Sequence, residues 1–169
     1  MNSKRILNPV SMFVFGLVLG TVSRILDIYT ENLGEIFSQM AVWILIGVII
    51  AIYSRTKKKA MVNVLLFCIG MLITYYVTAV ITKGVYGQSY IIGWTVFAFC
   101  SPIFAYFTWM TKEPGVLPKI ISVCIVAVSV LSSIIMFDGF RLYDVVIDGA
   151  LIYFLFIKKI PRKNRRQMQ

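Results

Sequence analysis

The stretch MVNVLLFCIGMLITYYVTAVIT, residues 61–82, decides the fold class of this chain. It runs for 22 residues without a charged side chain, and it closely follows a basic segment that contains Arg55, Lys57, Lys58 and Lys59. A helix needs about 20 predominantly apolar residues to cross the hydrocarbon core of a bilayer. This stretch therefore predicts a transmembrane helix that begins beside a cluster of positive charge.

The composition of the whole chain has the same character. Of its 169 residues, 59% are hydrophobic and 14% are charged, and the mean hydropathy is +0.85. Soluble domains average about 45–50% apolar and about 25% charged residues, so the composition disfavours a soluble globule. We expect an all-α membrane protein, a compact bundle of six transmembrane helices that forms one domain over residues 1–169. The expected spans are residues 7–26, 36–53, 61–82, 91–110, 120–137 and 140–157.

The net charge of +10 is explained by where the basic residues lie. Fourteen of the 17 Lys and Arg residues fall at the start of the chain, after the second span, after the fourth span, or in the tail at 158–169. Six of the seven acidic residues fall at the other ends of the spans. An excess of Lys and Arg marks the cytoplasmic side of a membrane. We therefore expect a protein of the cytoplasmic membrane of a bacterium, with both termini in the cytoplasm.

The basic tail at 158–169 also bears on partners. A cluster of Lys and Arg next to a membrane span is attracted to anionic lipid at the cytoplasmic face. We expect the tail to contact the bilayer, and we do not expect nucleic acid as a partner.

The sequence contains no recognisable catalytic or metal-binding pattern. The chain has no histidine, which excludes His-based triads and His metal sites. Its cysteines, Cys68, Cys100 and Cys124, lie far apart within apolar stretches, where cysteine usually behaves as a small hydrophobe. We expect no enzyme activity, no cofactor and no metal.

A few charged residues within or beside the spans are candidates for function, since a charge at the centre of a membrane helix costs about 2.5–3.5 kcal/mol. Arg24 lies toward the outer end of the first span, and Asp144 and Asp148 share one face of the last span. We expect Arg24 and Asp148 to form an ion pair, or to hold a ligand between them near the outer leaflet. Two alternatives stay open: Arg24 reaches the outer headgroups, or Asp148 is merely interfacial.

Aromatic residues in the outer halves of the third and fourth spans form the second part of this candidate site. Tyr75, Tyr76 and Trp94 are placed to line an outward-facing pocket for a small molecule, together with Arg24 and the two aspartates. The alternative is that these rings form part of the aromatic belt at the membrane surface.

Small residues predict where helices pack closely. Gly16 and Gly20 form a G-x-x-x-G motif on the first span, and Gly47 offers a similar small surface on the second. Pro102 removes one backbone N–H within the fourth span, which predicts a kink near Ala98. The hydroxyl of Ser101 can satisfy the carbonyl group that the proline leaves free.

Several short motifs carry a resemblance to a known group. They are A-V-W at Ala41–Trp43, G-x-x-x-x-Y-Y at Gly70–Tyr76, G-W at Gly93, and S-P-x-F-A at Ser101–Ala105. With these motifs the chain resembles small bacterial integral-membrane proteins that are classed only as a domain of unknown function. The resemblance implies a membrane location and brings no ligand or reaction with it.

The predicted architecture is also similar to that of the S components of energy-coupling-factor vitamin transporters. Those subunits bind a micronutrient from the outer side and dock on a shared energising module. The similarity implies that Gly16 and Gly20 form a docking face, although the alanine-rich first helix of that family is not evident here.

Two functional hypotheses follow from these observations. In the first, the chain binds or transports a small molecule from the outer side of the membrane. In the second, it is a structural, accessory or immunity-type protein that acts through helix contacts with a membrane partner subunit or a second copy of itself. The first requires that the candidate ligand residues line one cavity.

Overall fold

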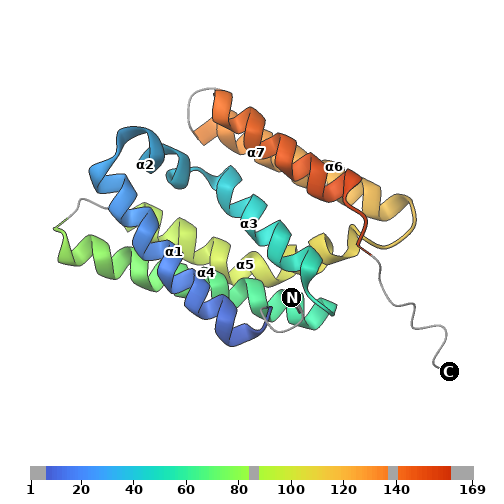
Figure 1. The fold of residues 1–169 in the computed structure, drawn as a ribbon, viewed down its shortest axis with the longest axis horizontal. Helices are drawn as coiled ribbons and strands as arrows, with labels where there is room; N and C mark the ends of the chain where they lie inside the picture. The colour runs from blue at the N-terminus through green and yellow to red at the C-terminus, as the bar shows by residue number, and fades with distance from the viewer. Residues whose placement is uncertain (1–6, 84–87, 137–140, 161–169) are drawn as a thin grey trace.

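The computed structural model describes residues 7–83, 88–136 and 141–160, and this part of the chain is entirely helical outside its turns and caps. Figure 1 shows the arrangement of its helices. The helices in chain order are α1 (Pro9–Tyr29), α2 (Glu31–Ser38), α3 (Met40–Tyr53), α4 (Lys57–Ile81), α5 (Gln88–Met110), α6 (Val116–Met136), α7 (Leu142–Ile152) and the π-helical turn η1 (Tyr153–Ile157). The predicted all-α fold class is confirmed.

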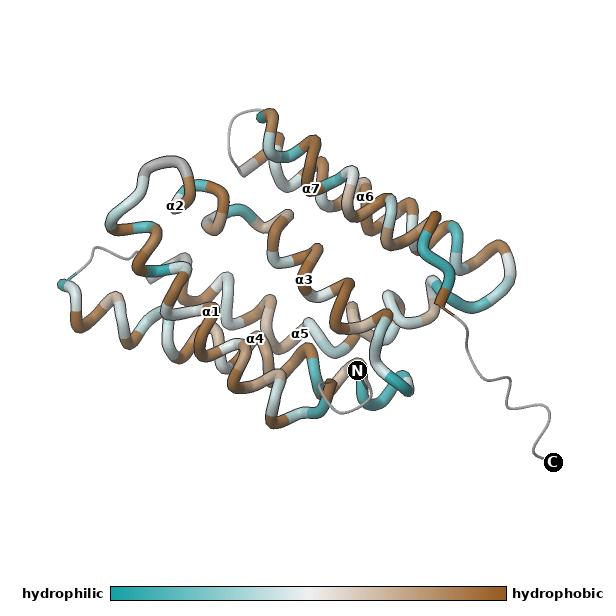
Figure 2. Tube along the Cα trace, in the orientation of Figure 1, coloured by the Kyte–Doolittle hydropathy of each residue, from teal (hydrophilic) through white to brown (hydrophobic). Residues whose placement is uncertain are grey.

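Four of these helices, namely α1, α4, α5 and α6, are long and apolar enough to cross a membrane. The apolar helix α3 is shorter, with 14 residues. Figure 2 shows hydrophobic residues along the lengths of the helices and hydrophilic ones near their ends. The structure thus supports a membrane protein with four membrane-capable helices among the described residues, which is fewer than the six spans that the sequence predicts.

The predicted second span, residues 36–53, is interrupted at Gln39. Its backbone is extended there (φ −80°, ψ 140°), so α2 ends at Ser38 and α3 begins at Met40. The interruption is stabilised by the indole of Trp43, which donates a hydrogen bond of 2.9 Å to the carbonyl of Phe37. A break of this kind frees backbone groups that need new partners, and a hydropathy pattern does not reveal it.

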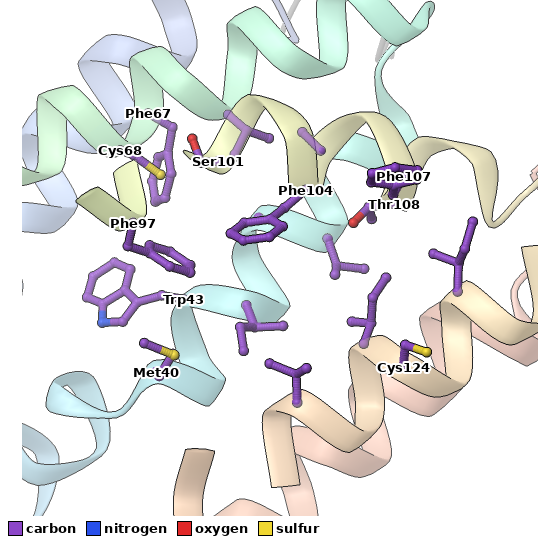
Figure 3. Close-up of a pocket in the computed structure, with 18 of the residues that line it drawn as sticks. Met40, Trp43, Phe67, Cys68, Phe97, Ser101, Phe104, Phe107, Thr108 and Cys124 are labelled. Atoms are coloured by element: carbon purple, nitrogen blue, oxygen red, sulfur yellow. The ribbon is translucent and has the colours of Figure 1, made fainter. Parts of the chain in front are cut away.

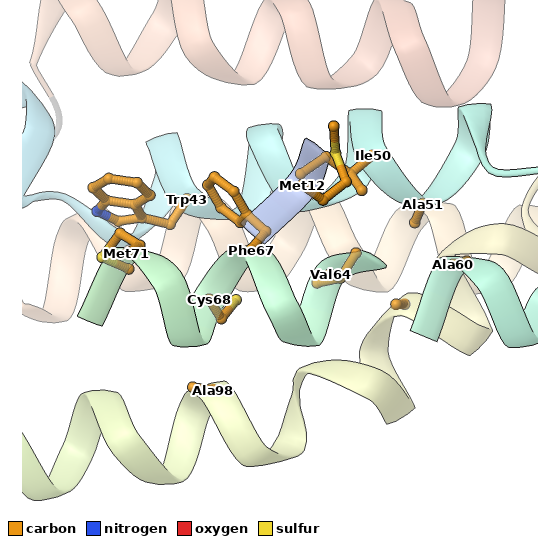
Figure 4. Packing of buried hydrophobic residues seen from close by; sticks show 11 residues of the cluster. Met12, Trp43, Ile50, Ala51, Ala60, Val64, Phe67, Cys68, Met71 and Ala98 are labelled. Carbon is orange, nitrogen blue, oxygen red and sulfur yellow. The ribbon is translucent and has the colours of Figure 1, made fainter. Parts of the chain in front are cut away.

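The helices α1, α4 and α5 form one packed group, and α1 and α4 make the most extensive contact in the molecule. A Cβ atom at Gly16 would overlap the carbonyl oxygen of Phe67, and one at Gly20 would overlap that of Met71. In addition, the hydroxyl of Thr74 donates a hydrogen bond of 2.7 Å to the carbonyl of Leu17. We call this contact the α1–α4 seam. Figure 4 shows the buried hydrophobic cluster to which α1 contributes Met12 and α4 contributes Phe67 and Met71.

The helices α6 and α7 form a second group, an antiparallel pair, and α3 lies between the two groups (Figure 1). The predicted sixth span, residues 140–157, corresponds to α7 followed by η1. In η1 the backbone N–H of Lys158 donates to the carbonyl of Tyr153, a π-type bond of 2.9 Å. Phe137 and residues 138–140 lie outside the described residues, as does most of the basic tail, 161–169.

Charged side chains tie several helix ends together at one end of the bundle. Lys57 at the start of α4 forms an ion pair of 3.2 Å with Glu113, in the turn after α5. Lys112 in the same turn donates to the carbonyl of Leu155 in η1 at 2.9 Å. We call this end, with Lys57, Lys112 and Lys158, the basic end of the bundle.

Candidate functional site

An apolar cavity of about 540 Å³ lies between α3, α4, α5 and α6 and can hold a ligand. In Figure 3 its lining side chains point from these four helices into a common space. The aromatic lining consists of Trp43 on α3, Phe67 on α4, and Phe97, Phe104 and Phe107 on α5. Protein sites for small molecules have volumes of about 300–1,000 Å³, so the cavity is large enough for one.

Polar groups in this lining are few. They are the side chains of Ser101 and Thr108 and the thiols of Cys68 and Cys124. Ser101 is already engaged, because its hydroxyl donates a hydrogen bond of 2.7 Å to the carbonyl of Ala98. This is the bond expected from the sequence, since Pro102 cannot donate to that carbonyl. No charged residue lines the cavity, so it can select a ligand by shape and apolar contact.

Large apolar side chains of α5 and α6 form part of the cavity lining. Phe104 and Phe107 line the cavity from α5, as Figure 3 shows. Ile121 and Val128 line it from α6. Gly47 of α3 also lines this space, and the nearest atom to a Cβ there would be Cγ1 of Val64 at 4.0 Å. Gly47 therefore provides room in the cavity, whereas the sequence placed it at a close helix contact.

The expected pair of Arg24 and Asp148 does not form. Arg24 is 7% exposed and forms an ion pair with Asp27, one helical turn further along α1. Its guanidinium also lies over the ring of Tyr75, 5.6 Å from the ring centroid. Arg24 takes these partners because both come from its own corner of the bundle, on α1 and α4.

The aspartates of α7 have hydroxyl partners on α6. Asp148 accepts a hydrogen bond of 2.6 Å from Ser129, and Asp144 accepts one of 3.1 Å from Ser133. Both carboxylates are buried, Asp144 completely and Asp148 with 5% exposure. The structure thus places the predicted residues Arg24 and Asp148 in two separate polar clusters.

The α7 pair connects to the rest of the molecule through its first turn. The guanidinium of Arg141 pairs with Glu35 on α2, and it donates a hydrogen bond of 2.7 Å to the hydroxyl of Tyr143. The buried amide of Gln39 donates to the same hydroxyl at 3.0 Å. From Arg141, Asp144 accepts a hydrogen bond of the backbone N–H at 2.8 Å.

The predicted aromatic residues lie apart from the cavity. Tyr75 and Tyr76 are half-buried on α4 with ring centroids 5.4 Å apart, and Trp94 packs against Phe97 at 5.9 Å. None of the six predicted ligand residues contributes to the cavity lining. Phe97 connects the two regions, because it touches Trp94 and lines the cavity.

The sequence carries no signal for this cavity. Its walls are residues such as Phe67, Phe97 and Phe104, which sit among many other apolar residues of the same spans. A search for charges in a membrane helix finds residues with unusual chemistry. It does not find an empty space between ordinary ones.

Metal ligation has no evident place in the residues that the structure describes. Within them, no three Cys, Asp or Glu side chains gather at one point. The cavity walls carry no acidic residue, and the two cysteines among them, Cys68 and Cys124, come from different helices.

Comparison with known proteins gives a family and no function. No curated protein and no solved structure matches the chain. A family model described as "Family of unknown function (DUF6518)" matches residues 2–153, which is most of the sequence. The sequence resemblance to an uncharacterised family agrees with this match, and nothing in these comparisons supports a similarity to vitamin-transporter S components. The chain belongs to the DUF6518 family of unknown function.

Proposed function

We propose that this chain is a multi-pass protein of the cytoplasmic membrane that binds the acyl chain of a lipid-like molecule in the cavity between α3, α4, α5 and α6. The observation that carries the proposal is the cavity itself, about 540 Å³ in volume and lined almost wholly by apolar side chains. Burial of apolar surface contributes about 25 cal/mol per Å², so a site without charges can still bind an acyl chain usefully.

The setting of the cavity favours an acyl chain over a polar nutrient. Three of its walls, α4, α5 and α6, are membrane-capable helices, so acyl chains are the medium around them. A polar molecule would lose its bonds to water on entry and find few partners there, which is costly. The ligand would therefore enter sideways from the bilayer.

In the orientation that we expect from the basic residues, the site would lie in the cytoplasmic half of the membrane. The basic end holds Lys57 and Lys112, and basic residues mark the cytoplasmic side. The parts of α4, α5 and α6 that line the cavity lie toward this end: residues 64–71, 97–108 and 120–128. The proposal thus differs from the outer-side site suggested by Arg24 and Tyr75.

A matched pair of glycine variants tests the proposal. Gly47→Phe places a ring in the cavity, whereas Gly93→Phe adds the same ring on α5 where nothing lies within 4 Å of a new Cβ. Long-chain amphiphiles should raise the melting temperature of the wild type and of Gly93→Phe, because a ligand that binds the folded state stabilises it. Gly47→Phe should lose this response.

Tryptophan fluorescence locates the bound chain. The protein has three tryptophans, so Trp94→Phe with Trp109→Phe leaves only Trp43, which lines the cavity and is 6% exposed. Lipids with brominated acyl chains should quench Trp43, and Gly47→Phe should prevent the quenching. Equal responses of both glycine variants would refute the site. A wild type that no amphiphile stabilises would instead favour the accessory role.

A further inference from the structure

The contact between α6 and α7 contains a ladder of two carboxylates and two hydroxyls. Asp144 and Asp148 lie one helical turn apart on α7, and Ser133 and Ser129 lie one turn apart on α6. Each serine donates to the aspartate opposite it, at 3.1 Å for Asp144 and 2.6 Å for Asp148. The four side chains are all at least nine-tenths buried.

The two aspartates differ in how completely their oxygen atoms are satisfied. Asp144 uses both, since Oδ1 accepts from Ser133 and Oδ2 accepts from the backbone N–H of Arg141 at 2.8 Å. Asp148 uses only Oδ1. Its Oδ2 is buried and has no hydrogen-bond partner. A buried acceptor without a partner carries a large desolvation cost, and an ionised one carries a larger cost.

No cation of the described residues pairs with either carboxylate. The nearest basic side chain along α7, Arg141, directs its guanidinium to Glu35 and Tyr143. On α6 the basic residue is Lys119, ten residues before Ser129, which corresponds to about 15 Å along a helix.

The remaining titratable side chains on these elements supply no positive charge. They are Tyr53 on α3, Cys124 on α6, Tyr143 on α7 and Tyr153 on η1. The two buried carboxylates therefore lie one helical turn apart with no positive side chain beside them among the described residues.

We propose that this ladder is a binding site for one monovalent cation, a proton or Na⁺, held at the free Oδ2 of Asp148. A cation there would satisfy the orphan oxygen and remove half of the buried negative charge. The surrounding ligands are all oxygen atoms, which suits hard cations. Ca²⁺ takes six to eight oxygen ligands, whereas Oδ2 of Asp148 is the one side-chain oxygen of the ladder that lacks a hydrogen-bond partner.

The test measures the melting temperature of the purified protein in detergent as a function of pH and of Na⁺, with choline replacing Na⁺ to hold ionic strength constant. If the ligand is a proton, the melting temperature should rise as the pH falls, because the folded state then binds more protons than the unfolded chain. If it is Na⁺, the temperature should rise with Na⁺ at constant pH. An infrared band of a protonated carboxyl group would appear only in the proton case.

Asp148→Asn is the decisive variant because an amide has the shape of the neutral acid. It should fold and lose the response that the wild type shows. Glu113→Gln is the matched control, an acid-to-amide change at the basic end, where Glu113 pairs with Lys57. It should keep the full response. A wild type insensitive to both pH and Na⁺, or an Asp148→Asn protein that responds like the wild type, would overturn the proposal.

Ser129→Ala tests the cation site if the Asp148→Asn protein does not accumulate. The hydroxyl of Ser129 donates to the carboxylate of Asp148 and so favours its ionised form. Without it the carboxylate should hold either cation more tightly, so the midpoint should move to higher pH in the proton case, or the concentration of Na⁺ needed should fall several-fold. An unchanged midpoint would show that the response arises elsewhere.

Discussion

The α1–α4 seam and the α5–α6 side of the bundle pack in opposite ways: the seam is closely packed, and the α5–α6 side borders a cavity. In the seam, Gly16, Gly20 and Gly70 let two backbones approach until a Cβ atom would overlap a carbonyl group. On the α5–α6 side, large side chains such as Phe104 and Ile121 line a cavity of about 540 Å³ that these helices share with α3 and α4. The seam leaves no space for another molecule, whereas the cavity is large enough to hold one.

The difference follows from the solvent. Lipid tails are as apolar as Leu side chains, so helices in a membrane gain little from apolar contact as such and associate where small residues and hydrogen bonds allow close packing. Glycine therefore defines the seam. Large apolar residues in a membrane gain little by packing against each other rather than against lipid. Acyl chains can therefore fill a space between them. We expect substitutions in the two regions to have contrasting effects.

The largest effect is expected at the seam. Gly16→Leu would force the backbones of α1 and α4 apart, because its Cβ overlaps the carbonyl oxygen of Phe67. Overpacking of this kind typically costs about 1–3 kcal/mol and sometimes more, and a clash with backbone belongs at the upper end. We expect the variant to lose about 3 kcal/mol of unfolding free energy, measured by steric trapping in bicelles.

Gly93→Leu is the control for that change, since a Cβ at this exposed position of α5 meets nothing within 4 Å. It should fold like the wild type. If both variants unfolded equally, leucine would be harmful in these helices for a reason unrelated to close packing, and the contrast between the two regions would fail.

The sequence predicted the fold class well and the candidate site poorly. The long spans could be found because each is a local run of apolar residues, as in α4. The break at Gln39 could not, because it depends on a bond from Trp43 to Phe37 that forms only in the folded chain. The pairing of Asp148 with Ser129 across 19 residues is likewise set by how α6 and α7 pack.

A short motif predicted a hydrogen bond correctly where both of its atoms lie on the same helix. Ser101 and Pro102 are adjacent, and the carbonyl left free is on the same helix, so the bond from Ser101 to Ala98 could be deduced from spacing. The sequence gives the small face of Gly16 and Gly20 equally directly, but not the helix that covers it. That helix is α4, so the face is not free for a partner subunit or a second copy.

A smaller effect is expected for the polar contact within the seam. Thr74→Val removes the hydroxyl that donates to the carbonyl of Leu17 at 2.7 Å and keeps nearly the same shape. Hydrogen bonds between membrane helices contribute about 0.6 kcal/mol on average. We expect a loss of this size in the same unfolding assay. Thr82→Val is the control, since its hydroxyl bonds only within its own helix region, to Thr78 and Ala79, and it should cost less.

The smallest effect, and of opposite sign, is expected at the cavity. Gly47→Ala adds a methyl group whose nearest neighbour is Cγ1 of Val64 at 4.0 Å, an ordinary contact distance. Alanine also favours a helix over glycine by about 0.5–1 kcal/mol. The free energy of unfolding of the variant should therefore be about 0.5 kcal/mol higher than that of the wild type. A loss of stability would mean that Gly47 touches a neighbour as Gly16 does. The cavity would then be closed in the folded protein, and the distinction between a sealed seam and an open cavity would disappear.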